Sequence, residues 1–358
     1  MYPALAILQA VADRVEKTLW VGGKGGMEAS LVTRYHVPYT EISAAGVHGV
    51  GLRALPGNLL KLGRGFYDAR RILRDFQPDV LLFTGGYVAV PMAVAASGMR
   101  KLLYVPDIEP GMALKALSRF SDVIALTDEK TRRYFKKNKK MVVTGYPKRI
   151  ELVRVPRGDA LRVFGFSSEL PVLLVIGGSK GAHSLNQSVF DNLESLLHKT
   201  QVLHITGQLD WDEARMKKLT LGSELEARYQ PYAYLHEEIS AAFSCASLAL
   251  SRAGASTLGE FPCYGLPAVL VPYPYAWRYQ KVNADHLVEA GAAMLVKNDD
   301  LSFKLDALVG DLLADEQRLT TMREKMSTLA SPDAASKIAD LLLDLAVEQG
   351  KERNIKND

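Results

Sequence analysis

The segment PVLLVIGGSKGAHSLNQSVF (171–190) joins an apolar run to a glycine-rich turn and then to a helical segment. Glycines let backbone amides approach a ligand closely, and the first turn of a helix offers free N–H groups to an anion. The residues that would form this cradle are Gly177, Gly178, Ser179 and Gly181. Their spacing matches neither Walker A nor the dinucleotide fingerprint, so a purely structural turn is the alternative.

A second strand, glycine turn and helix follow in SLALSRAGASTLGEF (247–261). The turn and the expected helix start comprise Ala255, Ser256, Thr257, Leu258 and Gly259. Glu260 follows them, and a carboxylate beside a phosphate-binding turn can accept hydrogen bonds from two ribose hydroxyls. Alternatively, Glu260 only complements the helix dipole, an effect worth about 0.3 to 1 kcal/mol.

The next segment, AVLVPYPYAWRYQKVNADHLVEAG (268–291), ends an apolar run with two prolines and then presents Tyr279, Gln280 and Asn283. Amide side chains both donate and accept hydrogen bonds, which suits sugar hydroxyls. We therefore expect Gln280 and Asn283 at the same ligand-binding edge as the two glycine turns.

No metal or cofactor is expected. Asp210 and Asp212 form the single Asp-x-Asp sequence, which can hold a divalent ion. The spacing of Asp210 and Glu213, however, favours a helix capping box. His183, after the first glycine turn, is interpreted as a surface or packing residue of the helix that follows.

Short apolar runs alternate with helical patterns along the chain, which predicts βαβ units. The runs lie at 18–23, 79–86, 101–107, 122–128, 141–147, 171–179, 201–207, 229–235, 247–254, 268–274 and 292–298. Their near-continuous hydrophobicity predicts parallel strands covered on both faces. The expected fold class is therefore α/β, with two doubly wound Rossmann-like domains whose strand ends face an interdomain cleft.

A polar stretch separates the two series of runs and places the predicted domains at 1–150 and 151–330. Ser/Pro/Asp start signals and a leucine stripe predict a closing helix at 331–350, packed on one of the domains. The polar segment 351–358 is expected to be a frayed tail.

The chain has 358 residues, of which 48% are hydrophobic and 23% charged, a composition typical of soluble globular proteins. It contains neither a long apolar span nor a signal-peptide pattern, so we expect a cytoplasmic location. The net charge of +4 favours an anionic substrate or surface but is too small to indicate nucleic acid. The basic and apolar segment 52–71 fits either contact with an anionic membrane or an amphipathic helix packed on the first sheet.

Four ordered motifs, VIGGSKGAHSLNQ, SRAGASTLGE, GLPAVLVPYPY and QKVNADHLVEAGAA, closely resemble the second half of the MurG-type glycosyltransferases. PALA, PDVLLFTGGYVAVP and TGYPKR match the first half, so the resemblance covers nearly the whole chain. It implies a GT-B fold and transfer of N-acetylglucosamine from UDP-N-acetylglucosamine to lipid I, the membrane-bound peptidoglycan precursor. The second domain would hold the donor and the first the lipid-linked acceptor, at the cytoplasmic face of the membrane.

The resemblance also implies roles for single residues. It implies that Ser179 contacts the diphosphate and that Arg149 is a cation that reaches the donor. The His236 backbone would contact uracil, and residues 255–259 would line the nucleotide. Glu260 would bind the ribose and Gln280 the donor sugar. The implied reaction is a single displacement with inversion, in which helix amides and Arg149 stabilise the leaving diphosphate. It needs neither an enzyme nucleophile nor a metal.

Two features depart from the family pattern. The family has GGTGGH just before a stretch like VYPALA, whereas this sequence begins MYPALA, so the first strand, its glycine loop and a candidate base are missing. An upstream start of the reading frame is the favoured explanation, because loss of the strand would expose apolar edges; a naturally short, impaired protein is the alternative. The family's HEQN aligns with 104–107, so Asp107 replaces Asn.

Asp107 or Glu109 could serve as a substitute base if its surroundings raise its pKa. The alternative is that Asp107 only ends a strand before a turn. Two other functions remain open at this stage. One is a related glycosyltransferase with another lipid or small acceptor, and the other is a nucleotide-sugar-binding protein without transferase activity.

Overall fold

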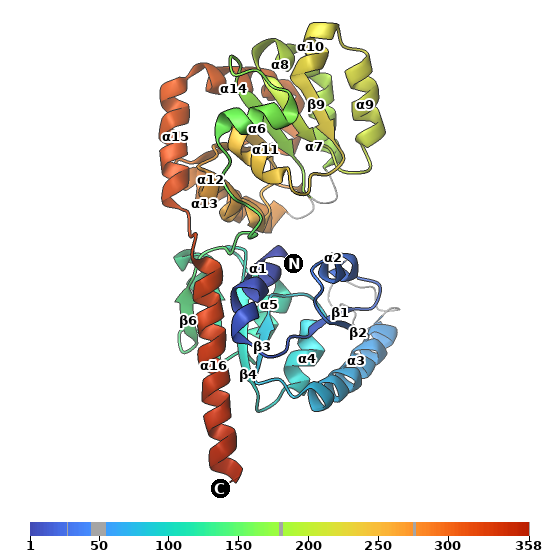
Figure 1. Ribbon diagram of the computed structural model, residues 1–358, viewed down its shortest axis with the longest axis vertical. Coiled ribbons are helices and arrows are strands. Elements are labelled where there is room, and N and C mark those ends of the chain that lie inside the picture. The colour runs from blue at the N-terminus through green and yellow to red at the C-terminus, as the bar shows by residue number, and fades with distance from the viewer. Residues whose placement is uncertain (27, 44–54, 179–181, 275–276, 358) are drawn as a thin grey trace. The chain divides into compact units, whose positions relative to one another are not determined.

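The computed structural model describes residues 1–26, 28–43, 55–178, 182–274 and 277–357. Within this part of the chain, two compact α/β units form, one from Met1–Arg149 with Asp333–Asp358 and the other from Ile150–Pro332. Figure 1 shows both units and the long last helix, α16 (Ala334–Asn357), which belongs to the first.

The second unit contains a six-stranded parallel sheet in the order β12-β11-β10-β7-β8-β9. Its strands are β7 (Val172–Ile176), β8 (Gln201–Ile205), β9 (Tyr229–Tyr232), β10 (Leu248–Ser251), β11 (Ala268–Leu270) and β12 (Ala293–Leu295). Because β7 has β8 on one side and β10 on the other, the chain winds outward from it in both directions. This is the doubly wound order predicted from the alternating apolar runs.

Most helices of the second unit lie in the connections between these strands, while α6 precedes β7 and α14 and α15 follow β12. They are α6 (Arg157–Phe164), α7 (His183–Asp191), α8 (Leu193–Lys199), α9 (Trp211–Leu219), α10 (Ser223–Arg228), α11 (Ile239–Cys245), α12 (Glu260–Tyr264), α13 (Trp277–Glu289), α14 (Leu301–Ala314) and α15 (Glu316–Thr328). Among the described residues, this unit also has the short 3-10 helices η3 (Ala255–Leu258) and η5 (Asn298–Asp300).

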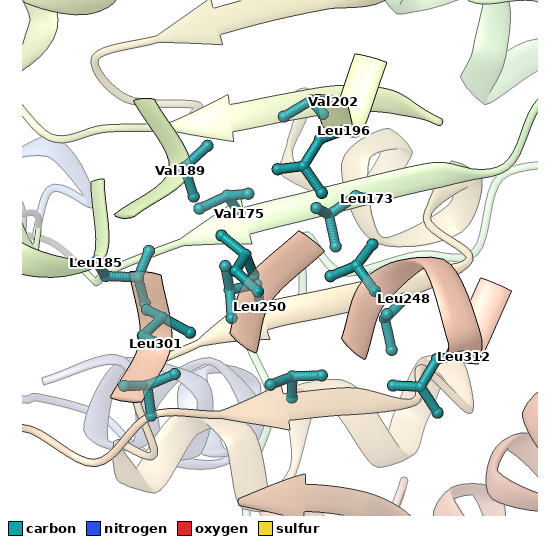
Figure 2. Close-up of a cluster of buried hydrophobic side chains, with 14 of the residues drawn as sticks. Leu173, Val175, Leu185, Val189, Leu196, Val202, Leu248, Leu250, Leu301 and Leu312 are labelled. Atoms are coloured by element: carbon teal, nitrogen blue, oxygen red, sulfur yellow. The ribbon is translucent and has the colours of Figure 1, made fainter. Parts of the chain in front are cut away.

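Both faces of the second sheet are buried at β7, which explains why this strand is apolar throughout. Leu173 and Val175 of β7 pack with leucines and valines of α7, α8 and α14 in the cluster of Figure 2. Leu174 is completely buried as well, and the alternation of side chains along a strand places it on the opposite face, where α11 contacts β7.

The first unit contains a four-stranded parallel sheet in the order β3-β4-β5-β6 and a separate two-stranded parallel sheet, β1-β2. The strands are β1 (Trp20–Gly23), β2 (Tyr39–Ile42), β3 (Val80–Phe83), β4 (Arg100–Val105), β5 (Val123–Leu126) and β6 (Lys140–Val143). Its helices, besides α16, are α1 (Tyr2–Val11), α2 (Glu28–Arg34), α3 (Leu55–Phe76), α4 (Ala89–Ala95) and α5 (Met112–Leu117), with 3-10 helices η1 (Ala12–Arg14) and η2 (Glu129–Tyr134).

Two helical layers cover the four-stranded sheet. One apolar cluster joins β3, β4 and β5 to α3, α4 and α5. The other joins β4 and β5 to α1 and α16, with Ile338 and Leu342 among its buried members. The Gln349 side chain accepts a hydrogen bond from the backbone N–H of Arg100 at 2.8 Å, which fastens α16 to the start of β4.

All eleven predicted strands are confirmed, and the structure adds β2, which was not predicted. Its sequence, YTEI, is short and half exposed, so it lacks the apolar run that marks the other strands. Residues 351–357 differ from the expected frayed tail, because α16 continues to Asn357.

The segment 52–71 forms most of α3, and residues 52–54 lie outside the described part of the chain. Ala69 and Leu73 are buried against the first unit, while Tyr67 is 73% exposed. The helix therefore packs one side on the domain and shows aromatic and basic side chains on the other. Among the described helices, none is both long enough and apolar enough to span a membrane.

Candidate active site

The strand order of the second sheet reverses at β7, which pairs with β8 on one side and with β10 on the other. Parallel α/β sheets bind ligands outside the carboxyl ends of their strands at such a switch point. The two glycine turns singled out in the sequence follow β7 and β10. The structure therefore brings both turns to the position where this fold binds ligands.

The turn after β7 requires glycine at Gly178. Its φ is +93°, and a Cβ built there would meet no atom within 4 Å. A side chain in this conformation costs about 1 to 2 kcal/mol, and the open space leaves the backbone accessible to a ligand. Gly177 beside it is half-buried. Ser179 and Gly181, predicted in the same cradle, lie outside the described residues.

The turn after β10 is tighter than the sequence indicates. The Thr257 N–H and hydroxyl both donate to the Gly254 carbonyl, at 3.0 and 2.7 Å, and the Gly259 N–H donates to Ser256 at 3.2 Å. This 3-10 pattern corrects the expected single helix from Ala255, because η3 ends at Leu258 and α12 begins only at Glu260. Ala255 and Ser256 remain half-buried, whereas Thr257 and Leu258 are buried.

Glu260 is the first residue of α12 and is only 5% exposed. Its place at a helix start agrees with the dipole interpretation, and its place after the Gly254 turn agrees with the ribose interpretation. Burying a carboxylate costs more than the 0.3 to 1 kcal/mol that a helix dipole returns. The helix dipole alone therefore does not account for this burial, and the role of Glu260 in binding stays a prediction.

Gln280 and Asn283 lie on α13 but in different surroundings. The Gln280 side-chain oxygen accepts a hydrogen bond from the Tyr273 backbone N–H at 2.9 Å, so its NH2 group is the part that can donate to a ligand. Asn283 is completely buried and donates to the Ala253 carbonyl at 3.2 Å. This bond places Asn283 at the turn after β10, on the edge where it was expected, and its contact with a sugar stays a prediction.

His236 lies in the connection between β9 and α11, at the carboxyl edge of the same sheet. Its side chain is exposed, and its ring centroid is 4.6 Å from that of Tyr234. The contact of its backbone with uracil, which the resemblance implies, stays a prediction.

Arg252, the first residue after β10, was given no role by the sequence interpretation. It is 6% exposed and donates to the Ser184 hydroxyl at 2.7 Å and to the Asn298 side chain at 3.0 Å. Burial lowers the pKa of this guanidinium to about 10, and Tyr273 acts in the opposite direction. Arg252 therefore links α7 and η5 through hydrogen bonds from a buried, positively charged side chain. An arginine directly after a fully buried strand is the sequence signal that could have identified it.

A buried hydrogen-bond chain runs from α7 to β9. Asn186 donates from Nδ2 to the Thr206 carbonyl at 2.8 Å and to Asp210 Oδ2 at 2.6 Å. With both of those protons used, Asn186 accepts at Oδ1 from His204 Nε2 at 3.0 Å. His204 Nδ1 in turn accepts from the Tyr229 hydroxyl at 3.0 Å. The bonds from Tyr229 through His204 and Asn186 are thus all directed toward the Asp210 carboxylate.

The capping box predicted for Asp210 and Glu213 is wrong. Asp210 occupies the N-cap of α9 but makes no capping hydrogen bond. One of its oxygens binds Asn186, and the other lies 2.7 Å from His183 Nδ1. Glu213 accepts from Gln187 at 2.7 Å. Both acids reach back to α7 because that helix presents side-chain donors to them.

The buried imidazole of His204 makes the fold sensitive to acid. Burial lowers its pKa from 6.5 to about 3. Between these values the unfolded state binds more protons, so the free energy of unfolding falls as the pH falls, by about 1.4 kcal/mol per unit. Denaturant titrations from pH 7 to pH 4 should show a flatter dependence in His204→Gln than in the wild type.

The exposed His198 provides the control for this prediction, because His198→Ala removes an imidazole without removing a buried one. We expect it to keep the wild-type slope. Equal slopes in His204→Gln and the wild type would show that His204 does not control this pH dependence.

The predicted residues of the first unit lie at the carboxyl ends of its strands. Asp107, after β4, is half-buried, and Glu109 is 4% exposed with Oε1 3.6 Å from Lys115 Nζ. Arg149 follows β6, and its guanidinium lies 4.3 Å from the centroid of the Tyr2 ring. The structure therefore brings Asp107 and Glu109 together on one loop and places Arg149 on the stacking surface of Tyr2.

Two α/β units with parallel sheets, the second doubly wound around β7, are the GT-B fold, a fold class of glycosyltransferases. Family models for the glycosyltransferase family 28 N-terminal and C-terminal domains match residues 1–126 and 172–338. The chain belongs to glycosyltransferase family 28.

Curated relatives named UDP-N-acetylglucosamine--N-acetylmuramyl-(pentapeptide) pyrophosphoryl-undecaprenol N-acetylglucosamine transferase are similar over most of their length. The Roseiflexus sp. (strain RS-1) protein is 37% identical, with 92% of this chain and 84% of the relative covered. The Desulforamulus reducens protein is 35% identical, with 94% and 93% covered. The crystal structure of Acinetobacter baumannii MurG gives a TM-score of 0.75 at 26% identity, with 96% and 95% covered. These similarities confirm the family resemblance seen in the sequence.

Proposed function

We propose that this protein transfers N-acetylglucosamine from UDP-N-acetylglucosamine to lipid I, the undecaprenyl-diphospho-muramoyl-pentapeptide precursor of peptidoglycan. Curated relatives at 32 to 37% identity carry the name of this activity. The observation that carries the proposal is structural: the glycine turn at Gly178 and the buried Glu260 follow the two adjacent strands of the switch point.

In this proposal the second unit binds the donor. Backbone amides of the 177–181 turn and the turn at 255–259 hold the diphosphate, and Glu260 accepts hydrogen bonds from the ribose hydroxyls. The His236 backbone meets uracil, and the Gln280 NH2 group donates to the sugar. Asn283 contributes indirectly, by holding the turn after β10 through Ala253.

The reaction proposed is one displacement with inversion. The acceptor hydroxyl oxygen forms a bond to the anomeric carbon while the bond from that carbon to the UDP phosphate oxygen breaks. The hydroxyl proton passes to a base, and the electron pair of the broken bond leaves with UDP. Helix amides and Arg149 stabilise the leaving diphosphate, because hydrogen bonds to charged groups are worth about 1.5 to 3 kcal/mol each. No metal and no cofactor takes part in this proposal.

Of the two candidate bases, Asp107 suits the role better, because Glu109 is 4% exposed beside Lys115 whereas Asp107 is half-buried. We expect Asp107→Asn to lower kcat by at least about 100-fold, the usual contribution of a general base, with unchanged UDP affinity. Glu109→Gln should have a smaller effect, and the exposed Glu129→Gln should have none. Wild-type turnover by Asp107→Asn would exclude it as the base.

We further propose that the protein works at the cytoplasmic face of the membrane as a peripheral protein, through the exposed side of α3. Phe66 and Tyr67 are exposed there between Arg64 and Arg70. Aromatic side chains between arginines suit an interface of anionic lipids, where each cation near the surface contributes about 1 kcal/mol.

The membrane contact predicts a charge-dependent loss of lipid binding. Arg64→Glu with Arg70→Glu should lower sedimentation with vesicles of anionic phospholipid about tenfold or more, since two charges are reversed. Exposed Arg215 on α9 provides the matched control, and Arg215→Glu should bind vesicles as the wild type does. Equal binding by all three proteins would exclude this face of α3.

The function itself is tested with radiolabelled UDP-N-acetylglucosamine and purified lipid I, with the Desulforamulus reducens relative assayed alongside. Label should pass to the lipid product. Transfer only to another acceptor would indicate a related glycosyltransferase, and UDP binding without any transfer would indicate a nucleotide-sugar-binding protein.

A further inference from the structure

His183 and Asp210 form an isolated pair of titratable side chains beside the proposed donor site. His183 is the first residue of α7, directly beyond the glycine turn that follows β7. Its Nδ1 lies 2.7 Å from Asp210 Oδ1, in the connection between β8 and α9. The His183 side chain is 70% exposed, whereas that of Asp210 is 6% exposed.

The hydrogen bonds around Asp210 orient the His183 ring. Asn186 donates one Nδ2 proton to the Thr206 carbonyl and accepts from His204 at Oδ1. Its remaining Nδ2 proton is donated to Asp210, which therefore accepts in this bond. An ionised Asp210 therefore also accepts from Nδ1–H of His183, and the ring is held with Nε2 on its exposed edge. The Asp210 carboxylate does not cap α9, so its burial serves α7 and this imidazole.

The first turn of α7 also receives positive charge from its other side. Arg252 donates to the Ser184 hydroxyl at 2.7 Å, and its Nε is buried without a hydrogen-bond partner in the described part of the chain. The helix N-terminus adds a partial positive charge. Arg252 and the helix end thus favour an anion beside His183, and an imidazolium there would lie between that anion and Asp210.

We propose that His183 contacts the diphosphate of the donor, with Asp210 as the residue that positions it. This inference rests on the proposed function. Nε2–H of the imidazolium donates to a phosphoryl oxygen, while Nδ1–H donates to Asp210. The pair thereby adds a charge-assisted hydrogen bond to those of the backbone amides. Among the described residues, Asp210 and Glu213 are acids that bind side chains of α7, Glu213 through Gln187, and η5, which binds Ser184 through Asn298, carries Asp299 and Asp300.

The experiment compares UDP with uridine by calorimetry, because only UDP carries the diphosphate. His183→Ala should weaken UDP binding about tenfold, the loss of one charge-assisted hydrogen bond, and leave uridine binding unchanged. His183→Arg, which keeps a cation, should retain most of the UDP affinity. His198→Ala, which removes an exposed imidazole from α8, should match the wild type for both ligands.

Asp210→Asn tests the positioning role, with thermal unfolding measured alongside. It should weaken UDP binding less than His183→Ala does, and in the double variant its effect should vanish, because Asp210 acts through His183. Wild-type UDP affinity in His183→Ala, or an equal loss for UDP and uridine, would overturn the proposal. Failure of the wild type to bind UDP would instead overturn the proposed function.

Discussion

Replacing Glu260 with glutamine is expected to weaken UDP binding by about 2 to 3 kcal/mol, or about 30- to 150-fold. The carboxylate is 5% exposed at the carboxyl edge of the sheet, so its replacement removes a charged acceptor from the ribose hydroxyls. We expect the lost UDP affinity to come from the contact with the ribose hydroxyls. The wild type should therefore prefer UDP over 2′-deoxy-UDP, and Glu260→Gln should bind the two alike.

Glu194 offers a matched control for the helix-dipole alternative, because it is an exposed acid in the first turn of α8. Glu194→Gln should lower the free energy of unfolding by at most about 1 kcal/mol and leave UDP affinity unchanged. If Glu260→Gln behaves in the same way, the ribose assignment is wrong.

The Gly178→Ala variant is expected to lose at least about 100-fold in kcat/KM. The residue has φ of +93° and open space where a Cβ would stand, so a methyl group would occupy the approach of the donor to the backbone. Strain alone costs about 1 to 2 kcal/mol and lowers stability rather than activity.

Gly98 separates strain from ligand exclusion, because it has φ of +79° and equally open surroundings in a turn of the first unit. Gly98→Ala should cost similar stability in thermal unfolding but keep wild-type kcat/KM. Equal activity losses in the two variants would mean that strain, and not exclusion of the donor, explains the effect at Gly178.

Much of the fold follows from local sequence. Strands buried on both faces need continuous apolar runs, which is why β7 and β10 are evident before their neighbours are known. The half-exposed β2 lacks this signal. The end of α16 was not predicted because residues 351–357 contain a single apolar residue, Ile355, which is too few for an apolar pattern.

The candidate site was only partly predictable, for a physical reason. Glycine turns and a lone acid are local features, so Gly178 and Glu260 could be found along the chain. The prediction of a capping box at Asp210 was wrong because its carboxylate binds side-chain donors from α7 rather than the backbone N–H groups of α9. These donors are distant in sequence. Arg252 and Asn283 likewise bind partners that lie 46 and 30 residues away in the sequence. The spacing within a local motif therefore cannot predict these contacts.

The central claim is that the donor nucleotide binds at the carboxyl edge of the second sheet, between the turns after β7 and β10. A crystal structure with bound UDP tests it most directly. We predict the diphosphate against the backbone at Gly178 and the ribose hydroxyls within hydrogen-bond distance of the Glu260 carboxylate. Nucleotide bound at any other edge, with Glu260 out of reach of the ribose, would contradict the account.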